Sequence, residues 1–307
     1  MKTLLLIDGN AIMHRAYHAL PSFKTKKGFP TNAIFGFFSI LNKVIKDFQP
    51  NYLVVCFDTP VPTFRKKIFK EYQAQRPKVE DELAIQFKIT KEALDKGGIF
   101  HLEKEGYEAD DLIGTIVAKY KNNKDLRILI LSGDRDILQL VDKNVFVITP
   151  QIGFSKSKIY NEEEVSKKFK IKPYQIVDYK ALIGDVSDNY PGAKGIGPKT
   201  AVKLINQFTS IENIYKNLDL LNEKLRKILT DNKENIDLSF KLAKIVTDVP
   251  VDISLPNAAF GGFKEELRDF LLQYEIKAVT ERIFNNNKKD NSDKPKKVKD
   301  SLQSSLF

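Results

Sequence analysis

The chain has 307 residues, with 50 lysines and arginines, 40 aspartates and glutamates, and a formal net charge of +10. This length is sufficient for one sizeable domain with a large core and a smaller second domain. The positive charge indicates a polyanionic partner such as nucleic acid. A basic protein of a membrane surface is the alternative, but the sequence has no long amphipathic pattern that would face lipid, so no membrane partner is expected.

The single cysteine, Cys56, lies in an apolar run, where we interpret it as a small core residue. A lone cysteine excludes an intramolecular disulfide framework and fits a reducing compartment. The first residues turn polar at Asp8, too soon for a signal peptide, and no segment reaches membrane-spanning length. We therefore expect a cytoplasmic, nucleoid-associated protein, with a monomer as the default state.

Three short apolar runs, each typical of a buried strand, lead to aspartates. In chain order they are residues 3–7 before Asp8, residues 52–57 before Asp58, and residues 127–131 before Asp134 and Asp136. Apolar residues at helical spacing over residues 31–48 supply the crossover that a parallel sheet needs. Because open α/β sheets build their sites beyond the carboxyl ends of the strands, these aspartates are predicted to converge at one edge.

The stretch from Gly106 to Leu140 is the most acidic part of this pattern, with Glu108, Asp110, Asp111, Asp134 and Asp136. Apolar residues recur at helical spacing after the EADD cluster, so its acids lie at or near a helix start, where negative charge is favoured. Two carboxylates about 4 Å apart repel by roughly 4 kcal/mol at an effective dielectric of about 20, and a shared cation would remove that cost. A solvated helix start is the alternative for EADD alone. Its pairing with strand-end aspartates favours a metal site.

Residues 63–79, TFRKKIFKEYQAQRPKV, carry six basic residues against a single glutamate, with aromatic residues interleaved. Basic side chains bind phosphates and aromatic faces accept unpaired bases, so this composition suits single-stranded nucleic acid. A solvated cationic helix with a narrow buried stripe is the alternative. The proximity of the segment to Asp58 favours a function.

His14 and His18 are four residues apart, a spacing that can hold zinc on a helix. No HExxH pattern accompanies them. We therefore interpret them as polar packing or substrate-side residues, and zinc is not among the expected cofactors.

A further motif covers residues 180–201, where Lys180 precedes Asp185, Asp188 and the sequence GAKGIGPKTA. Pro198 suits the first position of a helix that runs to about residue 208. Glycines let the backbone approach a phosphate, and amides at a helix start face the anion. The motif resembles the helix-hairpin-helix element, which binds the DNA backbone independently of sequence. A tight turn with a purely structural role is the alternative.

Residues 209–285 have helical patterns, with breaks near Asp231, residues 250–256 and residues 261–262, and are expected to extend the second domain. From residue 285 the sequence becomes NNNKKDNSDKPKKVKDS, which has almost nothing to bury and is predicted to be disordered. It ends in QSSLF, which has the form of a short docking motif on a flexible tether. Chance is the alternative for so short a pattern.

Six motifs occur together and in a fixed order: LLLIDGN, FDTPVPTFR, GYEADD, SGDRD, GDVSDN and GAKGIGPKTA. Over about residues 1–280 the chain resembles the 5′ nuclease family, above all the N-terminal 5′-3′ exonuclease domain of bacterial DNA polymerase I, with flap endonucleases as relatives. No polymerase sequence follows, and the docking tail favours a free-standing enzyme over an excised domain. The resemblance implies an α/β fold: a PIN-like, Rossmann-like, mostly parallel sheet flanked by helices, with a helical arch and a C-terminal helical domain containing a helix-hairpin-helix (helix-3-turn-helix) motif.

The resemblance also implies a structure-selective hydrolase of phosphodiesters at DNA 5′ ends and flaps, including RNA primers, in replication and repair. Its acidic metal positions match Asp8, Asp58, Glu108, Asp110, Asp111, Asp134, Asp136, Asp185 and Asp188. Oxygen-only ligands suit Mg²⁺, with Mn²⁺ able to substitute, and two ions are expected to activate a water and stabilise the leaving oxygen.

The family's basic or aromatic substrate positions match Arg15, Arg65, Tyr72, Arg76, Lys180 and Lys199. Further DNA contacts are expected at Lys70, Gly195, Gly197 and Thr200, and Arg76 is also expected to assist the reaction at the anionic phosphate. The resemblance leaves room for a potassium ion in the hairpin.

Gln73 departs from the family, which usually carries a lysine directly after the tyrosine as an electrophilic helper near the phosphate. Lys70 or Arg76 is hypothesised to substitute for it. Two alternatives to a nuclease of this type stay open: a catalytically weak protein that binds DNA structures and is recruited to the clamp, and a ribonuclease of the related PIN-like fold. The second alternative needs neither the basic arch nor the hairpin motif.

The expected domains are a catalytic domain over residues 1–172 with a basic arch at about 60–90, a helical DNA-binding domain over 173–284 with the hairpin motif at 184–208, and the tail over 285–307. QSSLF resembles the motif by which bacterial replication and repair enzymes dock on the sliding clamp. Gln303, Leu306 and Phe307 are its expected contacts, and the last two are predicted to enter an apolar pocket. The expected partners are thus the clamp and DNA with 5′ flaps, nicks or RNA primers.

Overall fold

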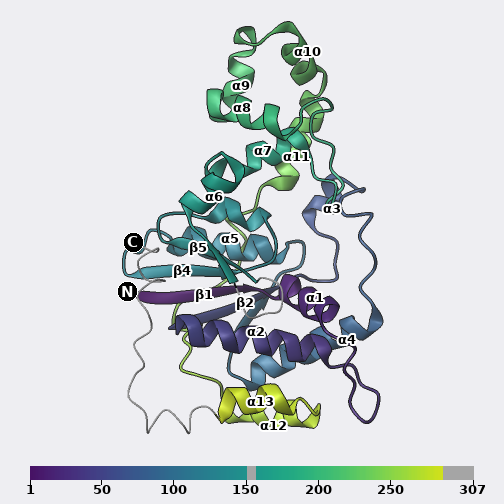
Figure 1. The fold of residues 1–307 in the computed structure, drawn as a ribbon, viewed down its shortest axis with the longest axis vertical. Coiled ribbons are helices and arrows are strands. Elements are labelled where there is room, and N and C mark those ends of the chain that lie inside the picture. The colour runs from purple at the N-terminus through teal and green to yellow at the C-terminus, as the bar shows by residue number, and fades with distance from the viewer. Residues whose placement is uncertain (151–156, 286–307) are drawn as a thin grey trace.

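The computed structural model describes residues 1–150 and 157–285. Its centre is a sheet of six strands in the order β3-β2-β1-β4-β5-β6 (Figure 1). All neighbouring strands are parallel except β5 and β6, which are antiparallel. The strands are β1 Lys2–Asp8, β2 Tyr52–Phe57, β3 Phe100–Glu103, β4 Leu126–Leu131, β5 Val145–Pro150 and β6 Ser157–Tyr160.

Alternating side chains of the central strands enter two different cores, as expected for strands with apolar residues on both faces. In β1, Leu4 and Leu6 pack on one face, whereas Leu5 and Ile7 pack on the other. The first face is covered by α5 (Ala109–Tyr120) and the second by α1 (Gly9–Ala19), α2 (Asn32–Phe48) and α4 (Asp81–Lys96). Cys56 is buried in the first core, as predicted.

A helical region stands away from the sheet at the top of Figure 1. It is connected to the sheet through α6 (Glu162–Phe169) and the packed pair α7 (Ile176–Ile183) and α11 (Lys233–Ala243). Its outer part contains α8 (Pro198–Phe208), α9 (Ile211–Lys216) and α10 (Glu223–Asp231). The loop between α7 and α8 contains the glycine-rich motif, so two helices flank it as predicted.

The chain then returns to the sheet, which corrects the expectation that everything up to residue 284 extends the second domain. Backbone bonds from Leu53 N to Ala258 O (2.8 Å) and from Phe260 N to Asn51 O (2.9 Å) fasten residues 258–260 beside β2. Helices α12 (Glu265–Gln273) and α13 (Lys277–Phe284) then pack against α4 and α2. Their apolar stripes, with Leu267, Leu271, Val279 and Ile283, are part of the core on that side of the sheet.

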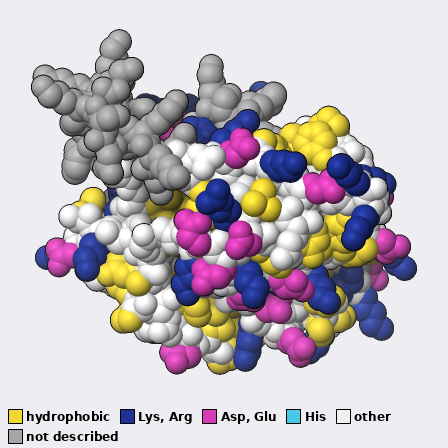
Figure 2. Space-filling model, turned by 90° about the horizontal axis from the view of Figure 1, so that it is seen from below, with side chains coloured by type: hydrophobic (Ala, Val, Ile, Leu, Met, Phe, Trp, Pro, Cys, Tyr) yellow, Lys and Arg dark blue, Asp and Glu magenta, His cyan; other side chains and the backbone are white. Residues whose placement is uncertain are grey.

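Figure 2 shows the molecule from below, the side on which α12 and α13 lie in Figure 1. Basic, acidic and apolar side chains are interspersed on this face, with no large patch of one charge. The described residues visible on this face therefore lack the concentrated positive charge expected of a surface that binds a DNA backbone.

The basic segment is not one helix. A short helix, α3 (Phe64–Ile68), is followed by turns through Arg76, and α4 begins at Asp81. The last third of the expected arch thus belongs to a helix packed on the catalytic core. None of the helices in the described ranges is both long and apolar enough to cross a membrane. The predicted tail with Gln303, Leu306 and Phe307 lies outside the described residues.

Candidate metal and nucleic-acid site

The aspartates at the ends of β1, β2 and β4 meet at one edge of the sheet. Asp8 caps α1 by accepting a hydrogen bond from Ala11 N (2.9 Å), and it accepts a second from Ser132 Oγ (2.7 Å), directly after β4. Asp58 accepts from Ala109 N (2.7 Å) at the start of α5. These bonds fix the strand ends and α5 relative to one another, as predicted for strands whose carboxyl ends meet at one edge of the sheet.

Asp8, Asp58, Glu108 and Asp110 form a first group of carboxyls, in which burial outweighs the nearby positive charge of Arg65 and Arg76. Burial raises the pKa of Asp8 to about 7, and the neighbouring Asp58 and Asp134 raise it further against two hydrogen bonds that lower it. Burial also raises the pKa of Glu108 to about 7. The pKa values of Asp58 and Asp110 are raised for the same reason, with nearby carboxylates adding to the effect for both. A cation bound among these carboxyls would lower their pKa values and favour the ionised form.

A second group contains Asp136, Asp185 and Asp188, each of which has one carboxylate oxygen within 4.8 Å of an oxygen of the other two. Here the protein supplies its own cations. Lys180 Nζ lies 2.6 Å from Asp136 Oδ1 and also contacts Asp185, and Arg76 Nη2 lies 2.6 Å from Asp188 Oδ1. Burial alone would raise the pKa of Asp185, but Lys180 and Ser187 bring it below its usual range.

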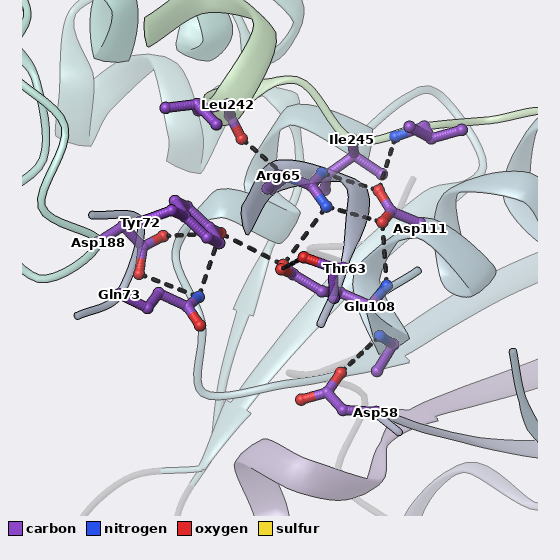
Figure 3. A network of polar contacts seen from close by, with 12 residues as sticks. Asp58, Thr63, Arg65, Tyr72, Gln73, Glu108, Asp111, Asp188, Leu242 and Ile245 are labelled. Carbon is purple, nitrogen blue, oxygen red and sulfur yellow. Dashed lines mark hydrogen bonds and ion pairs between the residues drawn. The ribbon is translucent and has the colours of Figure 1, made fainter. Parts of the chain in front are cut away.

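The hydroxyl of Tyr72 lies between the two groups (Figure 3). It lies 3.3 Å from Glu108 Oε2 and 3.4 Å from Asp188 Oδ2, and the side chain is 3% exposed. Gln73 Nε2 donates to Asp188 Oδ1 (3.3 Å) and to the Tyr72 hydroxyl (3.1 Å). In this conformation the tyrosine ring is buried and does not present a face to an unpaired base.

Two other predicted residues have environments that the sequence did not indicate. Arg65, expected at the DNA surface, is 2% exposed, and Asp111, expected among the metal ligands, is completely buried. The two side chains form a bidentate ion pair with N to O distances of 2.7 and 2.8 Å. Their donors and acceptors are thus engaged inside the protein.

The remaining predicted DNA contacts lie at or near the surface. Lys70, Gly195, Gly197 and Lys199 are exposed, Thr200 and Arg15 are half-buried, and the Arg76 side chain is 51% exposed. Lys199 and Thr200 lie in the first turn of α8, where free backbone amides favour an anion. His14, by contrast, packs edge-on against Phe87, with ring centroids 5.8 Å apart.

Ser132 was missed by the sequence argument. Its hydroxyl donates to Asp8 and accepts from Asp134 N (3.0 Å), so it holds two of the strand-end aspartates in place. A small hydroxyl residue between a strand and two aspartates is the signal that would have identified it.

Comparison with known proteins identifies the class to which this site belongs. Residues 3–170 match the family model of the 5′-3′ exonuclease N-terminal resolvase-like domain, and residues 171–266 match that of the 5′-3′ exonuclease C-terminal SAM fold. The chain therefore belongs to the 5′-3′ exonuclease family. It is a metal-dependent nuclease that acts on DNA, as the order of motifs predicted.

Individual relatives agree with this assignment. Over 289 residues the chain is 41% identical to a 5′-3′ exonuclease of Aquifex aeolicus, a match that covers 92% of this chain and 97% of that protein. It is 42% identical to DNA polymerase I of Caldicellulosiruptor bescii over 283 residues, which cover 91% of this chain and 33% of the polymerase. The bacteriophage T5 D15 flap endonuclease, solved with DNA and metal ions, shares the fold with a TM-score of 0.64 at 21% identity, over 92% of this chain and 98% of that one.

Proposed function

We propose that this nuclease hydrolyses phosphodiesters at DNA 5′ ends, nicks and 5′ flaps, RNA primers included, with Mg²⁺ as its ion and Mn²⁺ as a substitute. The observation that carries the proposal is the convergence of acids from three strand ends, the start of α5 and the hairpin loop. The similar T5 enzyme, solved with DNA and metal ions, supports the same use of the fold.

The carboxyls of this chain fit hard divalent cations because all of their ligand atoms are oxygens. The first ion would be held by the first group of carboxyls together with Asp134: Asp8, Asp58, Glu108, Asp110 and Asp134. The second would be held by Asp136, Asp185 and Asp188. When bound, such ions activate a water and stabilise the leaving oxygen of a phosphodiester.

The chain's own cations prepare the site for a polyanion. Lys180 and Arg76 offset the negative charge of Asp136, Asp185 and Asp188 in the absence of ions. Both cations have further donors that can reach a phosphate. The α8 start, with Lys199, would hold the backbone of the duplex beside them, and a potassium ion in the hairpin would add to this contact. Arg15 and Lys70 are proposed to contact the backbone of the same substrate.

The experiment is single-turnover cleavage of a labelled 5′-flap DNA in Mg²⁺, with and without chelator, by the natural chain and by Asp134→Asn. We expect cleavage near the flap junction that disappears with chelator and falls by at least about a hundredfold in the variant, because a neutral amide replaces an anionic ligand of the ion. Competition by single-stranded RNA distinguishes this enzyme from a ribonuclease. Tight flap binding without metal-dependent cleavage would instead support a DNA-structure-binding protein, an outcome to which the neutral Gln73 would contribute.

We also propose that the tail docks on the sliding clamp through Gln303, Leu306 and Phe307. The support is the QSSLF sequence alone. Deleting residues 303–307 should abolish clamp binding in a pull-down or calorimetric titration and leave flap cleavage without clamp unchanged. Unaltered clamp affinity after the deletion would rule the motif out.

A further inference from the structure

The ion pair between Arg65 and Asp111 is the most buried pair of opposite charges that the described residues contain, with side-chain exposures of 3% and 0%. Arg65 lies in α3, and Asp111 lies in the first turn of α5. Arg65 Nη1 is 2.7 Å from Asp111 Oδ2, and Nη2 is 2.8 Å from Oδ1. Planar guanidinium and carboxylate groups thus match in the geometry that gives the strongest charge-assisted hydrogen bonds.

The other donors of Arg65 are also used inside the protein. Nε donates to Leu242 O and Nη2 to Lys244 O, both at 2.9 Å, and these carbonyls lie at the end of α11. Nη1 additionally lies 3.4 Å from Glu108 Oε2. A guanidinium has five N–H groups and no acceptor, so little capacity remains for a DNA phosphate.

Asp111 is saturated in the same way. Besides the two bonds from Arg65, Oδ2 accepts from Glu108 N (3.1 Å) and Oδ1 accepts from Val246 N (2.9 Å). Each oxygen therefore receives two hydrogen bonds, which is the full capacity of its lone pairs. Coordination of a metal ion by Asp111 would require at least one of these buried bonds to break.

Glu108, in contrast, has a carboxylate that is held between Arg65, Thr63 and Tyr72 (Figure 3). Its backbone N–H is fixed by Asp111, and its carboxylate contacts Arg65, Thr63 Oγ1 (3.1 Å) and the Tyr72 hydroxyl (3.3 Å). Three of these four partners come from residues 63–72, and the fourth also binds the segment after α11. One buried unit thus connects the carboxylate cluster to the helical region.

We infer that Arg65 and Asp111 are positioning residues: their ion pair orients Glu108 in the metal cluster and fastens the cluster to residues 242–246, and neither contacts DNA or the ions directly. This inference rests on the proposed metal-dependent cleavage. A buried pair of this kind contributes little net stability compared with apolar residues of similar volume, so its value lies in fixing geometry. Partners that orient metal ligands typically change activity or metal affinity by about 10-fold to 100-fold when removed.

The test compares the full chain with Asp111→Asn, Arg65→Lys and the double variant, using Asp134→Asn as the reference in which a proposed ligand loses its charge. Affinity for Mn²⁺ alone is measured by electron paramagnetic resonance, flap affinity in Ca²⁺ by fluorescence anisotropy, and cleavage by single-turnover kinetics in saturating Mg²⁺. All are measured at a temperature at which thermal melts show every variant folded. Ile34→Val is the control for lost stability alone, because it leaves a small cavity in the buried core beside α2, on the other face of the sheet.

We expect Asp111→Asn and Arg65→Lys each to slow cleavage by about 10-fold to 100-fold while Mn²⁺ and flap affinities stay within about threefold. The double variant should be no slower than the slower single variant, because both changes break the same unit. Loss of Mn²⁺ binding in Asp111→Asn equal to that in Asp134→Asn would overturn the inference, as would weakened flap binding in Arg65→Lys or undiminished cleavage in both. If Asp134→Asn itself retains full cleavage, the proposed function fails instead.

Discussion

Gln73 lies between the two groups of acidic side chains described above, at a position where the family usually has a positively charged lysine. Its amide group binds Asp188 and the Tyr72 hydroxyl, and its backbone adopts the left-handed region with φ of 54°. Asp188 already has Arg76 as a partner at 2.6 Å. The neutral glutamine therefore supports the tyrosine geometrically but gives no charge to a phosphate.

Gln73→Lys is expected to raise the single-turnover rate of flap cleavage in saturating Mg²⁺ by about tenfold, since about 1.4 kcal/mol of added stabilisation of the transition state gives that factor. Gln75→Lys is the matched control: it adds the same charge at an exposed side chain, whose Nε2 donates to Asn189 Oδ1 (3.1 Å) away from the metal cluster. If the rate of Gln73→Lys equals that of the parent, charge at this position does not limit cleavage.

At the scale of elements, the loop between α7 and α8 is shaped by a close approach of two glycines. Gly184 ends α7 with φ of 74°, and Gly192 follows the Asp185 turn with φ of 61°. A Cβ on Gly192 would lie 2.2 Å from Gly184 N, which is far inside van der Waals contact. This approach holds Asp185 and Asp188 beside Asp136 while directing the rest of the loop to the start of α8.

Gly192→Ala should therefore destabilise the chain by about 1–3 kcal/mol from the left-handed backbone alone, with the clash adding to it. Thermal unfolding measures the stability, and Mn²⁺ titration should show weaker binding because Asp185 and Asp188 shift. Gly261→Ala is the control, since a Cβ there meets nothing within 4 Å and its φ is not in the left-handed region. Equal melting temperatures for the two variants would contradict the account.

For the whole molecule, the buried carboxyls couple stability to pH and to divalent ions. The pKa values of Asp8, Glu108 and Asp136 rise to about 7 in the folded chain, from 3.8 for aspartate and 4.5 for glutamate. The folded chain therefore keeps protons that the unfolded chain has already lost. The contribution of these groups to stability is fully present below the unfolded values and is lost as the pH rises toward 7.

In chelator, the melting temperature is expected to fall between about pH 5.5 and about pH 8, and added Mg²⁺ should raise it more at the higher pH, because ions and protons compete for the same oxygens. Calorimetry at both pH values measures the effect. Asp8→Asn removes one titrating group at similar volume and should make the dependence on pH shallower. A melting temperature in chelator that rises over this range would contradict the assigned pKa directions.

The sequence by itself determined the sheet, the edge at which the acids meet and the family. Strand–helix alternation and apolar runs are local signals, and parallel strands necessarily bring their carboxyl ends to one edge, so Asp8, Asp58 and Asp134 could be placed together before any contact was known. The hairpin could also be predicted from the sequence. Its glycines permit the backbone conformation that the turn requires, and Pro198 suits the first position of the helix that follows.

Only the tertiary structure decided which charged residues face the site and which are enclosed. From the sequence, Arg65 was expected to be a surface cation and Asp111 a metal ligand. Their partners Leu242, Lys244 and Val246 are more than a hundred residues away in the sequence, so the ion pair could not be predicted. The return of α12 and α13 to the sheet depends in the same way on a distant apolar surface, that of α2 and α4. Burial is a property of the assembled chain, so a residue's charge can be read from the sequence, whereas what that charge is used for depends on contacts that form only when the chain folds.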